Sequence, residues 1–205
     1  MGKILILNGS PRAPRSNSRQ YAALFAKACR QETVCFSVGQ CHPWEVARAL
    51  ETCSDLLLVF PLYADGLPVT LMGFLQALEA DPPHRRPTVS VLVNCGFLES
   101  EQNDTAIRIL RRFCQKNGYP FGSVLKIGSG EAILATPFRP LVQIRVRQLA
   151  RSLRRRSYGV FSVTMPLSKR MFLRASTRYW ESYGKKHGLT PAQMADPRIE
   201  GEARP

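Results

Sequence analysis

Short apolar runs alternate along the chain with segments whose apolar residues recur every three or four positions. The runs, which are typical of strands in a covered sheet, occupy residues 3–8, 33–38, 56–61, 88–93 and 124–127. Helical periodicity occupies residues 18–30, 100–117 and 139–156 and two stretches that begin at Pro43 and Pro68. Five strands interleaved with five helices predict a doubly wound α/β domain, in which helices cover both faces of a parallel sheet.

The periodicity also predicts which face of each helix is buried. We expect the inward residues of the first three helices to be Tyr21, Leu24, Phe25, Ala28, Trp44, Ala47, Leu50, Leu71, Met72, Leu75 and Leu78. Those of the next two helices are expected to be Ala106, Leu110, Phe113, Cys114, Val142, Val146, Leu149 and Leu153. Gly118 is placed to end the fourth helix, because glycine readily adopts the left-handed conformation found at helix C-termini.

The order of the elements predicts where a ligand would bind. We expect a flavodoxin-like three-layer sandwich with five parallel strands in the order 2-1-3-4-5. Ligands of such sheets bind beyond the carboxyl ends of the strands, where the strand order reverses. Three segments should therefore line a site, namely residues 8–18, 61–66 and 94–99.

The first of these segments predicts an anion site. A turn at residues 8–11 leads into a helix, where unpaired N–H groups and the positive end of the helix dipole converge. Ser10, Ser16, Asn17 and Ser18 add side-chain donors, and Arg12 and Arg15 add positive charge. Gly9 is the only glycine of the turn and no Gly-Lys-Ser/Thr follows, so the segment matches neither common nucleotide-binding motif. The alternative is that its serines only cap the helix.

The second segment is a stiff loop between two prolines. Pro61 and Pro68 fix φ at its ends, and Gly66 is expected to permit a tight reversal between them. Tyr63 either stacks on a planar ring or lies half-buried against protein. A loop of this kind can present its main-chain groups to a heterocycle.

The third segment follows Asn94. Gly96 allows close backbone approach, Phe97 offers a second aromatic surface, and Glu99 is expected to begin the next helix near its positive end. We interpret Cys95 as a small residue beside the ligand rather than as a nucleophile, because none of the three histidines lies in the three loops.

Composition narrows the chemistry and the compartment. No serine-hydrolase elbow, paired carboxylates or spaced Cys/His metal ligands are found, which favours chemistry carried by a cofactor. No apolar run approaches the ~20 residues of a membrane span, and no secretory signal is evident. The six cysteines are scattered without a C-x-x-C pair, which is typical of a reducing compartment, so we expect a cytoplasmic protein.

The first two loops resemble those of the NADPH-dependent FMN reductases and related flavodoxin-fold NAD(P)H oxidoreductases. The likeness covers about residues 1–130 and rests on residues 7–12, 16–18 and 61–63 with Pro68. It implies an FMN phosphate held by Ser10, Arg12, Ser16, Asn17 and Ser18. It also implies an isoalloxazine ring between Pro61, Leu62, Tyr63 and Ala64 on one side and Asn94, Cys95, Gly96 and Phe97 on the other. Related iron–sulfur flavoproteins carry a compact cysteine cluster, but Cys35, Cys41 and Cys53 are too widely spaced for one.

The resemblance implies an FMN-dependent oxidoreductase and, as in its relatives, a homodimer. Hydride would pass from NAD(P)H to the flavin, with main-chain N–H groups of the loops stabilising the reduced ring. A second substrate (a quinone, a nitro or azo compound, or a flavin) would then take its place, and no catalytic side chain or metal is expected. One alternative is a flavodoxin-like electron carrier without nicotinamide turnover, although such carriers are usually acidic and this chain has a pI near 10.1. Another is a relic fold with an empty site, whose basic tail binds acidic partners.

The positive charge gathers in the C-terminal third. Residues 1–138 hold 14 basic and 11 acidic side chains, whereas residues 139–205 hold 15 and 4. We expect a flavodoxin-like domain over residues 1–157, followed by a basic, aromatic extension over 158–205 with a helix capped by Ser168 and a disordered end at 196–205. The extension would pack on a partner subunit, attract anionic substrates, or contact a membrane surface; its aromatic content favours a protein interface. Nucleic-acid binding is disfavoured, because no recognised module is found.

Overall fold

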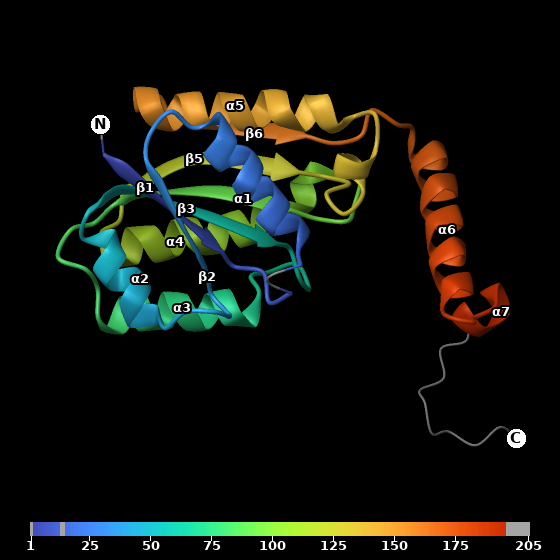
Figure 1. The fold of residues 1–205 in the computed structure, drawn as a ribbon, viewed down its shortest axis with the longest axis horizontal. Coiled ribbons are helices and arrows are strands. Elements are labelled where there is room, and N and C mark those ends of the chain that lie inside the picture. Colours follow the sequence, from blue (N-terminus) through green and yellow to red (C-terminus); the bar gives the residue numbers. More distant parts are fainter. Residues whose placement is uncertain (1, 13–14, 196–205) are drawn as a thin grey trace, which may run out of the picture. The chain divides into compact units, whose positions relative to one another are not determined.

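The computed structural model describes residues 2–12 and 15–195, which divide after Met165 into two compact units. The first unit contains one sheet of six parallel strands in the order β2-β1-β3-β4-β5-β6 (Figure 1). The strands are β1 (Lys3–Asn8), β2 (Thr33–Ser37), β3 (Cys53–Pro61), β4 (Thr88–Asn94), β5 (Phe121–Ile127) and β6 (Val160–Val163). The flavodoxin-like doubly wound sheet and the order of its first five strands are therefore confirmed, with one strand more than predicted.

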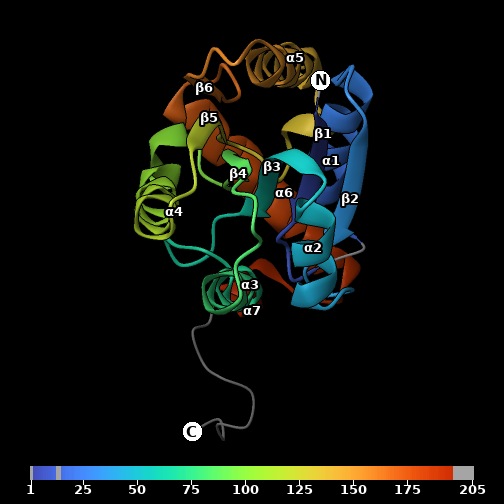
Figure 2. The same ribbon diagram turned by 90° about the vertical axis from the view of Figure 1, so that its left-hand side faces the viewer.

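Helices cover both faces of the sheet. The helices of the first unit are α1 (Asn17–Ala28), α2 (Pro43–Leu50), α3 (Val69–Ala80), α4 (Asp104–Asn117) and α5 (Arg139–Arg155), with short 3₁₀ turns η1 (Ser100–Asn103) and η2 (Ile133–Ala135). Figures 1 and 2 show α1 and α5 on one face and α2, α3 and α4 on the other. This is the three-layer sandwich that the alternating pattern predicts.

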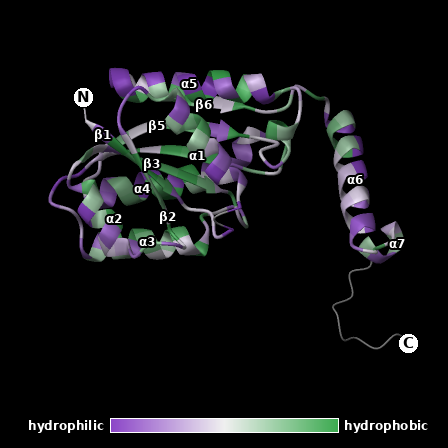
Figure 3. Cartoon of the chain, viewed as in Figure 1, coloured by the Kyte–Doolittle hydropathy of each residue, from purple (hydrophilic) through white to green (hydrophobic). Residues whose placement is uncertain are grey.

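The core forms because alternate residues of each central strand point to opposite faces. Leu5 and Leu7 of β1 belong to the cluster beneath α2, α3 and α4, whereas Ile4 and Ile6 are buried on the other side of the strand. The central strands are accordingly apolar throughout, and the covering helices carry one apolar and one polar face (Figure 3). Two buried layers hold the carboxyl ends of the strands rigid.

The predicted helix ends are largely confirmed. Ser16 caps α1 by accepting a hydrogen bond from the N–H of Arg19 at 3.2 Å, and Pro43 occupies the first turn of α2. Gly118 ends α4 with φ +71°. The helix predicted over 100–117 begins instead with the 3₁₀ turn η1, so α4 starts at Asp104.

Two inward positions were predicted wrongly. Trp44 is 60% exposed and Met72 is 47% exposed, whereas Val46 and Phe74 are buried in their place. A short helix can rotate about its axis by about one residue and still bury an apolar stripe. The apolar residues around Trp44 and Met72 fit either orientation of their helices. The structure therefore leaves large apolar side chains on the outer surfaces of α2 and α3.

The sixth strand belongs to the first unit, which ends at Met165. β6 pairs in parallel with β5 and buries Val163 and Met165. The chain turns into it at Arg156, which adopts φ +53° and lies 3.4 Å from the carboxylate of buried Asp55. Arg156 holds the α5–β6 turn to the sheet through this ion pair.

The second unit contains helices α6 (Lys169–Lys186) and α7 (Pro191–Met194). Ser168 caps α6 as predicted, because its hydroxyl accepts a hydrogen bond from the N–H of Met171 at 3.3 Å. Met194 of α7 packs against Gly184 of α6, and Gly188 turns the chain between the two helices with φ +76°. The predicted disorder of residues 196–205 concerns residues outside those that the structure describes.

In the part of the chain that the structure describes, no helix combines the length and apolar character needed to cross a bilayer.

We predict opposite effects for alanine at two glycines. A Cβ at Gly128, just after β5, would lie 2.5 Å from the carbonyl oxygen of Leu98 and 2.8 Å from the hydroxyl oxygen of Thr164. G128A should therefore lower the free energy of unfolding by about 1–3 kcal/mol. A Cβ at Gly73 of α3 would meet no atom within 4 Å, so the control G73A should raise it by about 0.5–1 kcal/mol. Urea titrations measure both, and equal effects would contradict the close approach at Gly128.

Candidate functional site

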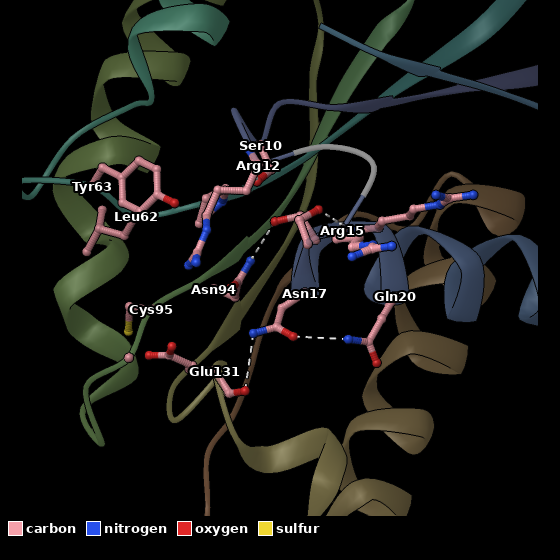
Figure 4. A pocket seen from close by; sticks show the side chains of 15 residues that line it. Ser10, Arg12, Arg15, Asn17, Gln20, Leu62, Tyr63, Asn94, Cys95 and Glu131 are labelled. Atoms are coloured by element: carbon pink, nitrogen blue, oxygen red, sulfur yellow. Dashed lines mark hydrogen bonds between the residues drawn. The ribbon is translucent and has the colours of Figure 1, made fainter. Parts of the chain in front are cut away.

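A cavity of about 550 Å³ opens at the carboxyl ends of β1, β3 and β4, where the strand order reverses (Figure 4). All three segments predicted from the sequence contribute to it. The residues that line it are Ser10, Arg12, Arg15, Ser16, Asn17, Ser18, Arg19, Gln20, Pro61, Leu62, Tyr63, Asn94, Cys95, Gly96 and Glu131. Its position agrees with the general rule for open α/β sheets.

The loop after β1 is shaped by its own polar side chains. The N–H of Ser10 donates to the side-chain oxygen of Asn8 at 3.1 Å, and the N–H of Arg12 donates to the hydroxyl oxygen of Ser10 at 3.3 Å. These local bonds are those of Asx and Ser/Thr turns. They orient the buried Ser10 hydroxyl, whose own proton remains a donor, and they place Arg12 at the cavity.

The N-terminus of α1 forms the adjoining wall. Ser16 caps the helix through Arg19, and the N–H groups of a first helical turn have no intrahelical partner. The side chain of Asn17 accepts from the amide of Gln20 at 3.1 Å and donates to the main-chain oxygen of Glu131 at 3.2 Å (Figure 4). Asn17 is thereby fixed at the mouth of the helix, where the dipole favours an anion.

The charges around the cavity are unevenly distributed. Arg12, Arg15 and Arg19 come from the first loop and the start of α1. Among the described residues that line the cavity, Glu131 supplies the only carboxylate. One of its oxygens lies 3.8 Å from the point that a Cβ would occupy if Gly96 carried a side chain. The α1 side of the cavity is therefore cationic, and the negative charge lies against the loop after β4.

The loop after β3 turns more sharply than the sequence indicated, and at different residues. Tyr63 and Gly66 exchange main-chain hydrogen bonds of 3.3 and 2.9 Å around a two-residue turn. The positive φ angles fall on Ala64 (+45°) and Asp65 (+56°), not on Gly66 as expected. A left-handed alanine is strained, and such strain is common at ligand sites. The turn presents Tyr63, which is 39% exposed, at the cavity.

Asn94 joins the elements that surround the cavity. Its side-chain amide donates to the main-chain oxygen of Phe60 at 3.0 Å and to the hydroxyl oxygen of Ser18 at 3.2 Å. Its own main-chain oxygen accepts from the N–H of Leu62 at 2.7 Å. Asn94 and Ser18 were predicted as ligand contacts, and the structure shows that they also connect β3, β4 and α1.

Cys95 is unsuited to nucleophilic chemistry, in agreement with the interpretation from the sequence. It is 3% exposed, and the amide of Asn103 donates to its sulfur at 3.4 Å. Burial raises the pKa of the Cys95 thiol, so little thiolate forms at neutral pH. It lines the cavity as a small, neutral side chain.

A fourth loop, after β5, completes the cavity and was missed by the sequence analysis. The N–H groups of Ser129 and Gly130 donate to the main-chain oxygens of Phe97 and Cys95, and the Tyr21 hydroxyl donates to the oxygen of Gly130 at 2.7 Å. These bonds place Glu131 at the site. The signal that could have found it is a glycine-rich segment, Gly128 to Gly130, directly after the strand predicted over 124–127.

Most of the predicted site residues lie together. Eleven of the thirteen predicted contacts line the cavity, whereas Ala64 and Phe97 are not among its lining residues. Three main-chain N–H groups expected to face a ligand are bonded within the protein: Leu62 to Asn94, Tyr63 to Gly66, and Cys95 to Ile127. Arg15 was noted only as a source of charge, and Arg19, Gln20 and Glu131 were not predicted.

Comparisons with known proteins identify the fold. A flavodoxin from Streptococcus pneumoniae matches with a TM-score of 0.57 and 17% identity, over 76% of this chain and 99% of that chain. An NAD(P)H:quinone oxidoreductase from Methanothermobacter marburgensis matches with a TM-score of 0.58 and 15% identity, over 74% and 95%. An FMN-dependent NADH-azoreductase from Bacillus anthracis, solved in complex with FMN, matches with a TM-score of 0.57 and 14% identity, over 75% and 99%. The fold is flavodoxin-like.

At these identities the likeness establishes the fold alone. A scan against protein families and a search of curated proteins found no match. The chemistry of the cavity must therefore be argued from its own residues.

We predict that Cys95 reacts slowly with alkylating reagents in the folded protein. Its raised pKa and burial should keep labelling by iodoacetamide low at neutral pH, and the rate should continue to rise above about pH 8.5, the ordinary pKa of a thiol. Cys35, which is exposed on β2, should be labelled first although burial of its thiol also raises its pKa. Peptide mass spectrometry after timed labelling distinguishes the two, and preferential labelling of Cys95 at pH 7 would show it to be a reactive thiol.

Proposed function

We propose that this cavity binds FMN and that the protein is an NAD(P)H-dependent oxidoreductase. One observation carries the proposal: a cationic helix N-terminus and the loops after β3 and β4 line the same cavity. The helix N-terminus suits a phosphate. The two loops, with Tyr63 and Pro61, offer apolar and aromatic surface to a planar ring. The three structural neighbours, by their names, include an FMN-dependent reductase and a quinone reductase.

The residues present fit this cofactor. A volume of about 550 Å³ lies within the range of ordinary small-molecule sites, about 300–1,000 Å³. The buried hydroxyl oxygens of Ser10 and Ser18 accept hydrogen bonds from the protein, so each hydroxyl still has its proton to donate to a ligand. Hydroxyl, amide and guanidinium donors next to a helix N-terminus are the chemistry that recognises a phosphate dianion. We therefore assign the phosphate to Ser10, Arg12, Ser16, Asn17 and Ser18, and we add Arg15.

The chain would bind and orient the cofactor rather than react itself. FMN, when bound, would supply hydride acceptance from a nicotinamide and electron donation to a second substrate. The cationic α1 side would hold the phosphate, and Glu131 on the opposite side would repel it, so the charges favour one orientation of an elongated ligand. We assign the ring to Pro61, Leu62, Tyr63, Asn94, Cys95 and Gly96, with Ala64 and Phe97 at the rim as the resemblance implies. No side chain of the cavity is assigned as an acid, a base or a metal ligand.

The alternative function is that of an electron carrier without nicotinamide turnover, since a flavodoxin is among the structural neighbours. The cationic cavity favours the reductase, because three arginines can attract a nicotinamide dinucleotide, which is anionic. The second substrate would be a small electron acceptor such as a quinone, a nitro or azo compound, or a flavin.

We further propose that the protein is a cytoplasmic homodimer. All six cysteines are free, which agrees with a reducing compartment. The outward face of α3 next to the cavity carries Val69 (83% exposed) and Met72, and Glu79 is the only charged residue of that helix. An uncharged, apolar face beside a ligand site is typical of a protein interface.

Removal of two cavity charges should affect FMN and riboflavin differently. R12Q/R15Q should weaken FMN binding by about tenfold at low salt, because it removes two charged donors to the phosphate. Riboflavin has the same ring and lacks the phosphate, so its affinity should change little. Titrations that follow quenching of flavin fluorescence measure both dissociation constants.

The matched control is R147Q/R151Q, which removes two exposed charges from α5 and gives the same net charge. It should bind FMN as the unaltered protein does. Equal loss for FMN and riboflavin in R12Q/R15Q, or equal weakening by the control, would contradict the phosphate assignment.

Rapid anaerobic mixing distinguishes a reductase from a carrier. The FMN-loaded protein should lose its absorbance near ~450 nm quickly when it is mixed with NADPH or NADH, since a reductase binds the nicotinamide beside the flavin. A carrier would be reduced by dithionite but not by either nicotinamide. Stopped-flow absorbance measures the rate, and an unbleached, fully loaded protein would exclude the reductase.

A further inference from the structure

Helix α6 has two chemically different faces. One face carries aromatic and aliphatic side chains, and the opposite face carries cations spaced four residues apart. The first face consists of Phe172, Leu173, Ser176, Tyr179, Trp180 and Tyr183. The second consists of Arg170, Arg174, Arg178, Glu181 and Lys185. The helix is thus amphipathic over its whole length, about five turns.

The apolar face is not covered by the unit to which it belongs. Tyr179 (49%), Trp180 (44%) and Leu173 (55%) are exposed, and Gly184 is the only buried residue of the helix. The rings of Tyr179 and Tyr183 lie edge-on to Trp180, at 5.2 and 5.9 Å between centroids, so the aromatic side chains form one continuous patch. Such a patch on a charged helix requires a partner surface.

The charges of this unit indicate the nature of that surface. Residues 166–195 contain six lysines and arginines and a single acidic residue, Glu181. Lysines lie at both ends of the helix, at Lys169, Lys185 and Lys186. Their long aliphatic stems would let the charges reach the headgroups of a lipid bilayer while the aromatic rings insert into it. A helix with arginines on one face and Trp, Tyr, Phe and Leu on the other is the form that lies in a lipid–water interface. Tyr and Trp, which have one apolar and one polar end, are enriched at that level.

A second copy of the chain is a less suitable partner for the same face. Each copy has a formal net charge of +14, and packing two α6 helices together would bring two sets of six cations close. An anionic bilayer instead neutralises these charges and accepts the aromatic rings. We propose that α6 is an interfacial helix that attaches the protein to membranes containing anionic lipid. This inference does not depend on FMN binding, and the vesicle test below can be read on the protein with or without flavin.

The first test is sedimentation of the full chain with vesicles of phosphatidylcholine, alone or with roughly a third of phosphatidylglycerol. The protein should bind the anionic vesicles and remain in solution with the neutral ones, and binding should weaken as salt is added. R170Q/R174Q/R178Q should lower the partition coefficient by about 100-fold, since each cation near a charged surface contributes about fivefold. F172S/W180S, which keeps every charge, should lower it as well, because the rings no longer insert.

The matched control is R139Q/R147Q/R151Q on α5, which removes three exposed arginines from the first unit and leaves α6 intact. Its net charge equals that of the α6 variant, so general electrostatic attraction would affect both equally. Retained binding by the control supports an α6-specific attachment, and equal loss by the two variants overturns it.

Fluorescence reports on the helix itself. The chain has two tryptophans, Trp44 on α2 and Trp180 on α6, so W44F leaves Trp180 as the only reporter. Its emission should shift to the blue when anionic vesicles are added. Unshifted emission, or absence of sedimentation with anionic vesicles, overturns the proposal. So does an α6 variant that leaves vesicle binding intact but changes the molar mass in light scattering, because α6 would then bind a second copy.

Discussion

The side-chain amide of Asn94 holds the candidate site together. It bonds to β3 through Phe60 and to α1 through Ser18, while its main chain pairs with Leu62. Asn94, Phe60 and Ser18 are buried, and a buried polar group without a partner is costly, so the three segments are held in one arrangement. The loops after β4 and β5 are joined in the same way through Gly130 and Cys95. The cavity is therefore a preformed concave surface on a rigid sheet.

Positive and negative charges are unevenly distributed around this preformed cavity. Arg12 and Arg15 belong to the loop that leads into α1, whereas the carboxylate of Glu131 lies near Gly96 in the loop after β4. Asn17 connects the two sides, because its side chain sits at the helix N-terminus and binds the main chain of Glu131. A ligand with one anionic end and one neutral, planar end fits this distribution in a single orientation. A compact dianion or a wholly apolar molecule would use only half of the cavity.

The sequence was sufficient to predict the sheet, its strand order and three of the four loops, because these follow from the alternation of apolar runs and helical periods. It failed where a pattern was compatible with two phases, as at Trp44 and Met72, and where backbone geometry overrode residue preference, as at Ala64 and Asp65. Glu131 was missed because its position depends on hydrogen bonds between residues far apart in the sequence. Asn17 and Cys95 make these bonds with the loop after β5. Such contacts leave no local signal. β6 falls within the segment assigned to the extension, and its membership of the sheet depends on pairing with β5.

Both units of the chain are basic, since residues 1–165 hold 21 basic and 11 acidic side chains and residues 166–195 hold six and one. In the first unit the excess lies mainly in the seven arginines of residues 139–156, and the three arginines that line the cavity face a single carboxylate, that of Glu131. The second unit concentrates cations on a helix that buries almost none of its own apolar surface. The cations of α6 and its exposed aromatic face together suit a surface that is anionic outside and apolar beneath, and the two proposed functions can be tested separately.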